Sequence, residues 1–216
     1  MSRRLPVLCG LQRTIEQLHD VALDLDVRQY MVGPQQAREL PGAQGELPEQ
    51  LFIREAQDAV ELALYVHPEV MRRLRRDDPR RRLHSGNFEP FCIALEGVSH
   101  FVFAAWRIEA AWQTSPLELE LQAEVDKFAA SWLLLRAQCA DMALVGAPLL
   151  RRLFVAYELR QALSTAEQDR YVAASRAAEG FCRTMAQRHG RARDDRRFVQ
   201  DMRLFSRQTL AQKLRY

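Results

Sequence analysis

The chain has 216 residues and a mass of 25.0 kDa, and 48% of its residues are hydrophobic and 27% charged. This balance is that of an ordinary globular domain, and it excludes an intrinsically disordered chain. With only nine glycines and nine prolines, the sequence is also not collagen-like or dominated by linkers. The length suits one domain, or one domain with a small appendage.

The formal net charge of +3 hides an uneven distribution of charge along the chain. Counted in blocks, residues 1–69 carry −5, 70–84 carry +5, 85–142 carry −5, 143–182 carry +1 and 183–216 carry +7. All basic residues except Lys127 and Lys213 are arginines. This arginine bias is typical of a bacterial genome rich in G and C. The alternation makes electrostatic pairing, within the chain or with a partner, a property to test.

The N-terminal part, residues 1–66, is predicted to hold one helix, a loop and a hairpin. Leu11, Ile15 and Leu18 follow helical spacing and predict an amphipathic helix from Leu11 to Leu25. A polar stretch rich in proline and glycine, from Gly33 to Glu49, predicts a loop.

Residues 51–66 admit two interpretations. Val60, Leu62, Leu64 and Val66 recur at every second position, which is the periodicity of a strand, and residues 51–53 supply a second strand with a turn near 57–58. A helix over 49–65 is the alternative, because Ala, Glu and Leu favour helices. We prefer the hairpin.

Residues 67–216 show helical patterns joined by short connections. Proline after His67 predicts a short helix to Arg76, and the almost uniformly apolar segment from Phe91 to Trp106 predicts a central, buried helix. Further helices are expected from the capping pattern at Ser115, from Pro148, from a second capping pattern at 164–167, and from Asp194 or Asp195 through Thr209. Gly190 is the expected end of the third of these, which starts at 164–167.

The fold class expected from these patterns is mainly α: a multi-helix bundle with a small N-terminal part that contains a β-hairpin on the preferred interpretation. We place the N-terminal part at 1–66 and the bundle at 67–216. Short connections favour antiparallel packing of neighbouring helices.

Glu96 and His100 form the first candidate site. They are four residues apart on the buried helix, so that carboxylate and imidazole share a helix face. The favoured interpretation is a buried pair that organises the core, because an unpaired charge would be costly there. The alternatives are a catalytic acid–base pair, a metal site and a polar patch that faces a partner. Glu120 and Glu124 could supply further carboxylates to a metal, although Glu124 could equally pair with Lys127 on the surface.

The arginine clusters form the second candidate site, because guanidinium groups suit phosphate oxygens. The first cluster lies within 72–82 and the second within 183–215. The residues singled out as phosphate or nucleic-acid ligands are Arg72, Arg73, Arg75, Arg76, Arg80, Arg81, Arg82, Arg193, Arg196 and Arg197. The favoured interpretation is nevertheless that these arginines form salt bridges on solvated faces, because aspartates interrupt both clusters. A phosphate-bearing partner and a membrane surface are the alternatives.

Other functional signals are absent from the sequence. No glycine-rich phosphate loop, dinucleotide fingerprint or close cysteine pair is present, so no cofactor is expected. Cys92, Cys139 and Cys182 lie in apolar helical patterns and are expected to be buried, and His189 is expected to be an exposed cap. No apolar run reaches the roughly 18 residues of a membrane span, and the start of the chain does not resemble a secretory signal.

From these features we expect a cytoplasmic protein with reduced thiols that acts as a non-enzymatic interaction or scaffold protein. It would bind a protein partner or itself as a homo-oligomer. The apolar density of 88–135 is the third candidate feature: the favoured interpretation is that all of it is core, and the alternative is that it leaves a face for dimerisation. Nucleic-acid binding through the arginine clusters is the first alternative. An enzyme centred on Glu96 and His100 is the second.

Overall fold

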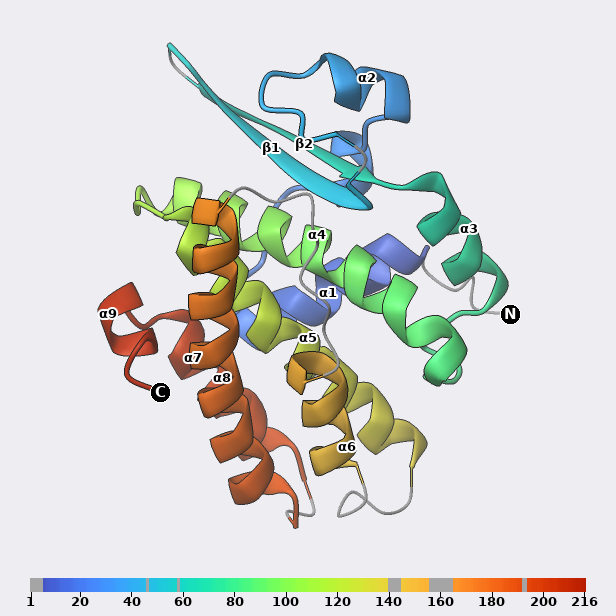
Figure 1. Cartoon of the computed structure of the whole chain (residues 1–216), viewed down its shortest axis with the longest axis vertical. Helices are drawn as coiled ribbons and strands as arrows, with labels where there is room; N and C mark the ends of the chain where they lie inside the picture. Colours follow the sequence, from blue (N-terminus) through green and yellow to red (C-terminus); the bar gives the residue numbers. More distant parts are fainter. Residues whose placement is uncertain (1–5, 46, 58, 140–144, 156–164, 192–193) are drawn as a thin grey trace. The chain divides into compact units, whose positions relative to one another are not determined.

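The computed structural model describes residues 6–45, 47–57, 59–139, 145–155, 165–191 and 194–216. The fold is mainly α with one two-stranded antiparallel hairpin in the N-terminal part, as the sequence predicts (Figure 1). The chain divides into two compact units, which are described separately below. The first comprises residues 1–17 and 21–113, and the second comprises 18–20 and 114–216.

The first unit contains seven of the described elements. They are α1 (Val7–His19, whose last two residues belong to the second unit), the 3-10 turn η1 (Val27–Tyr30), α2 (Pro34–Glu39), β1 (Glu49–Ala56), β2 (Ala59–Val66), α3 (Pro68–Arg76) and α4 (Ser85–Glu109). The hairpin and α3 both pack against α4. Its core is apolar and fully buried at Ile15, Leu64, Leu74, Phe91 and Phe101.

The β-hairpin confirms the preferred interpretation of residues 51–66. Leu51 pairs with Leu64 and Ile53 with Leu62, which places their side chains on the same face. This face packs toward α4 near its base, where Leu64 is fully buried, and becomes exposed toward the tip, where Ile53 is 46% exposed. The turn falls near residue 57, as expected.

The helices differ from the sequence prediction in several places. The first helix begins at Val7 rather than Leu11 and ends at His19 rather than Leu25, because Asp20 takes a left-handed backbone conformation (φ 57°) that stops it. The short helix α2 lies inside the expected loop and starts at Pro34, which fits the first helical position. The last predicted helix ends at Ser206 rather than Thr209, and Thr209 caps a further short helix, Leu210–Lys213, that was not predicted.

Helix α4 is the central element of the first unit. Nearly all residues from Phe91 to Ala105 are buried, as predicted. In the described part of the chain it is the one helix long and apolar enough to cross a membrane, but 78% of its apolar window is buried inside the structure. That burial is typical of a core helix.

The second unit is a helical bundle. Its described elements are α5 (Pro116–Gln138), α6 (Gly146–Leu150), the single π-helical turn η3 (Arg151–Val155), α7 (Thr165–His189), α8 (Arg196–Ser206) and α9 (Leu210–Lys213). Helices α5 and α7 lie side by side (Figure 1). Ser115 caps α5 by accepting a hydrogen bond from the Glu118 amide, as its capping pattern predicts. The second capping pattern, at 164–167, begins outside the described residues. Trp132 stacks on Phe198 with ring centroids 5.5 Å apart.

Candidate functional site

Glu96 and His100 lie on α4 in the first unit, and both are buried. A third member joins them: Glu49, at the start of β1, brings its Oε2 atom to 4.0 Å from Nδ1 of His100. Gly97 allows this approach, because a Cβ atom at that position would lie 3.2 Å from Glu49 Oε2 and 3.0 Å from Leu64 Cδ1. The glycine therefore allows the hairpin to pack closely on α4, which favours the interpretation of Glu96 and His100 as a structural pair.

Glu49 was missed in the sequence because the first strand was taken to start at Leu51. The signal was nonetheless present. Extending the strand by two residues places Glu49 on the same face as Leu51 and Ile53, since side chains alternate along a strand. A carboxylate at the buried end of an apolar strand face needs a polar neighbour, which His100 supplies.

The metal hypothesis gains no support from the geometry. Glu96 and His100 belong to the first unit, whereas Glu120 and Glu124 belong to the second. Among the described residues, no three His, Cys, Asp or Glu side chains are grouped so that they could hold a metal ion. Glu124 does bind Lys127, with an Oε1–Nζ distance of 2.7 Å, but this pair is buried rather than on the surface.

The second unit holds a buried polar network that the sequence did not reveal. His19 Nε2 lies 2.9 Å from Asp126 Oδ1, and Gln122 Nε2 donates to the same oxygen at 3.0 Å. Lys213 Nζ, fully buried on α9, binds Gln122 Oε1 at 3.0 Å and Glu118 Oε1 at 3.2 Å. Because the network ties the end of α1 and the short helix α9 to α5, we assign it a structural role.

The second arginine cluster belongs to the same unit, and much of it is engaged in ion pairs. Arg188 binds Asp201, Arg203 binds Asp20, and Arg207 donates to the backbone oxygens of His19 and Asp20. Arg196 and Arg197 are exposed at the start of α8, and Arg193 lies outside the described residues. His189, expected to be exposed, is buried and bound to Asp201 at 2.7 Å. Sequence spacing did not reveal this partner, which lies on another helix.

The first arginine cluster lies on α3 and on the loop that leads to α4. Helix α3 starts where His67 Nδ1 accepts a hydrogen bond from the Glu69 amide. Its last turn carries Arg73, Arg75 and Arg76, whose positive charges interact favourably with the negative end of the helix dipole. Two members of the cluster bind neighbouring acidic residues: Arg72 pairs with Glu69, and Arg73 pairs with Glu89.

The loop after α3 is held in place by one buried amide. Asn87 Nδ2 donates to the backbone oxygens of Arg82 (2.8 Å) and Asp77 (3.4 Å), and its Oδ1 atom accepts from the His84 amide (2.9 Å). Asp78 binds the guanidinium of Arg80 with both oxygens. The sequence therefore fixes the backbone from which Arg80 and Arg81 extend.

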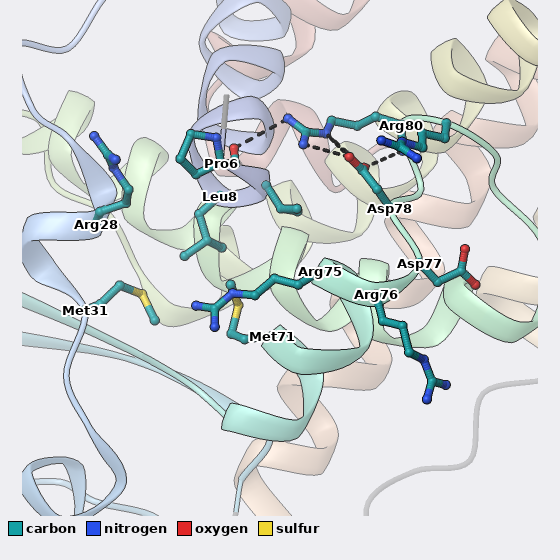
Figure 2. A pocket seen from close by; sticks show the side chains of 12 residues that line it. Pro6, Leu8, Arg28, Met31, Met71, Arg75, Arg76, Asp77, Asp78 and Arg80 are labelled. Carbon is teal, nitrogen blue, oxygen red and sulfur yellow. Dashed lines mark hydrogen bonds and ion pairs between the residues drawn. The ribbon is translucent and has the colours of Figure 1, made fainter. Parts of the chain in front are cut away.

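Four arginines of the first cluster line a pocket of about 740 Å³ in the first unit, which we call the arginine pocket: Arg75, Arg76, Arg80 and Arg81 (Figure 2). Its walls come from the start of α1, from η1 and the residue after it, from α3 and from the following loop. They are formed by Pro6, Val7, Leu8, Arg28, Met31, Met71, Arg75, Arg76, Asp77, Asp78, Arg80 and Arg81. Arg75 points across the pocket in Figure 2, toward the side of Leu8 and Met31.

The charges in the arginine pocket are only partly compensated. Arg28 is bound by Asp26, and this hydrogen-bonded guanidinium lowers the pKa of Asp26 to about 2. Arg80 is bound by Asp78, and Asp77 by His84 at 2.9 Å. Within the described residues, Arg75, Arg76 and Arg81 form no ion pair. The pocket is therefore left with an excess of positive charge.

Thiol chemistry is not indicated at either unit. Burial raises the pKa of Cys182 well above its ordinary value, and the nearby carboxylates of Glu124 and Asp126 raise it further. Burial also raises the pKa of Cys9, with Asp26 adding to the effect. Cys182 is buried as expected, but Cys92 is only half-buried and Cys139 is exposed at the end of α5. Raised pKa values disfavour the reactive thiolate.

Comparisons with known proteins add no relative. Scans of protein-family models, of curated proteins and of solved structures each find no significant match to this chain. Function must therefore be argued from the site itself.

Proposed function

We propose that this protein is a non-enzymatic binding protein that takes up a partner bearing phosphate or carboxylate groups in the arginine pocket. The observation that carries the proposal is that three arginines without an ion-pair partner among the described residues line one pocket: Arg75, Arg76 and Arg81. Guanidinium groups bind such oxyanions with paired N–H donors.

Concavity distinguishes this site from an ordinary basic surface. Surface arginines are usually solvated, and their ion pairs contribute little. The pocket of about 740 Å³ instead falls within the range of small-molecule sites, and the three arginines that line it are exposed and accessible to a ligand. The first turn of α1 also lines the pocket and contains no acidic side chain, so that its helix dipole adds to the positive potential.

Nucleic-acid binding is less well supported at this site. Among the described residues that line the arginine pocket, none is aromatic. Binding of single strands generally relies on stacking of bases on aromatic side chains. An oligonucleotide is therefore an outcome to test, not the expected ligand.

The proposal is tested by NMR of the arginine Nε–Hε groups during titration with pyrophosphate. We expect saturable shifts for Arg75, Arg76 and Arg81, assigned through single Arg→Gln variants, and weaker binding as salt rises. Arg54, which pairs with Glu61 on the hairpin, is the internal control and should not shift. Uniform shifts of all arginines, or none at millimolar pyrophosphate, would contradict the proposal.

A further inference from the structure

The arginine pocket is lined by apolar side chains as well as by Arg75, Arg76 and Arg81. Leu8 and Val7, at the start of α1, are 5% and 8% exposed, and the half-buried Met31 and Met71 extend this apolar surface. Met71 lies one turn before Arg75 on α3, and Figure 2 shows Arg75 extending toward Leu8 and Met31. These side chains come from three segments that are distant in the sequence, so the apolar wall is a property of the folded unit.

Cationic side chains line the same pocket. Arg75 and Arg76 extend from the last turn of α3, and Arg81 from the loop after it. The carboxylates of Asp77 and Asp78 are engaged by His84 and Arg80, so they do not neutralise these three cations. A ligand that occupies the pocket therefore meets both positive charge and alkyl and thioether groups.

We infer that the ligand of the arginine pocket is an amphipathic anion, with a flexible alkyl chain and a phosphate or carboxylate head. This inference rests on the proposed function and names its ligand class. The chain would lie on Leu8, Met31 and Met71, and the head would bind Arg75, Arg76 and Arg81. Methionine suits this role because its unbranched, polarisable side chain adapts to flexible apolar ligands. An inorganic phosphate alone would leave most of a 740 Å³ pocket empty.

Calorimetric titration of the full chain with ethyl, butyl, hexyl and octyl phosphate, each below its micelle concentration, tests the inference. We expect one site per chain and an affinity that increases about three- to fourfold for each added methylene group that enters the pocket, until the apolar wall is covered. Heptanoate should bind in the same pocket, whereas hexyltrimethylammonium, with the opposite charge, should not.

Two sets of variants separate the head from the chain. Arg75→Gln with Arg81→Gln should remove binding of every alkyl phosphate. Met31→Gln with Met71→Gln should abolish the dependence on chain length and preserve pyrophosphate binding. Ile53→Gln, on the exposed part of the hairpin, is the matched control for an apolar-to-amide change. It should leave the dependence on chain length and the binding of pyrophosphate unchanged.

The outcomes distinguish failure of the inference from failure of the proposed function. Binding of pyrophosphate with no gain along the alkyl series would overturn the inference and leave anion binding intact. Binding of no anion would remove both. Vesicles containing phosphatidate identify the source of the head group: binding to vesicles with none to monomeric octyl phosphate would overturn the assignment of a single chain to this pocket.

Discussion

Lys213 is a cation with no exposed surface, and its ammonium group is bound to Glu118 and Gln122. Removing one member of a buried ion pair leaves the other charge without compensation. We therefore expect Lys213→Met to lower the free energy of unfolding by about 3 kcal/mol, measured by urea denaturation.

A surface pair provides the control for that measurement. Arg183 binds Glu179 on α7 but is 62% exposed, so Arg183→Met should change the unfolding free energy by less than about 1 kcal/mol. Replacing both Lys213 and Glu118 by apolar residues should recover part of the loss, because no charge is then left buried alone. Equal effects of the two single substitutions would contradict the structural role of the network.

The cysteines should differ in reactivity because their surroundings differ. Cys182 is fully buried and its pKa is raised, whereas Cys139 is exposed. At neutral pH the raised pKa keeps the Cys182 thiol protonated, and only the thiolate is alkylated rapidly. Mass spectrometry after brief iodoacetamide treatment should find Cys139 modified and Cys182 unmodified. Early modification of Cys182 in the folded protein would show that α7 packs differently.

At the scale of elements, the junction between α3 and α4 depends on Asn87. Its amide makes three hydrogen bonds to the backbone and is 1% exposed. We expect Asn87→Ala to cost about 1–3 kcal/mol, because it leaves buried backbone groups without partners. Since the loop carries Arg80 and Arg81, the variant should also bind pyrophosphate more weakly. Thermal unfolding and titration measure the two effects.

The exposed amide of Gln35, which donates to Glu39 on α2, is the control for Asn87. Gln35→Ala removes a hydrogen bond that water replaces, so stability and pyrophosphate affinity should both stay close to those of the unaltered protein. If Asn87→Ala left both properties unchanged, the loop would be held by other contacts and its assigned role would be wrong.

Local patterns predicted the elements well where a single period dominated. The two-residue alternation at Val60–Val66 predicted β2, the apolar run at Phe91–Trp106 predicted α4, and Ser115 marked the start of α5. Boundaries were predicted less well. The end of α1 depends on the backbone conformation of Asp20, and the start of β1 depends on pairing with Val66, neither of which a periodic pattern reveals.

At the scale of the whole molecule, charge segregation predicted which residues could matter but not which of them share a site. The arginines within 72–82 were identified from the sequence. Their neighbours in the pocket, Leu8, Arg28 and Met31, were not, because they lie more than 40 residues away along the chain and only tertiary packing brings them together. Self-association and the division at residues 66 and 67 stay predictions.

On this proposal, arginines bind anions where the fold makes a pocket, and not wherever they are numerous. Two triple variants with the same change in net charge test it: Arg75→Gln, Arg76→Gln, Arg81→Gln in the arginine pocket, and Arg54→Gln, Arg72→Gln, Arg183→Gln among exposed ion pairs. In calorimetric titrations with pyrophosphate, we predict that the first triple loses binding and the second retains the affinity of the unaltered protein. Equal losses in both would show that net charge alone attracts the anion and would contradict the account.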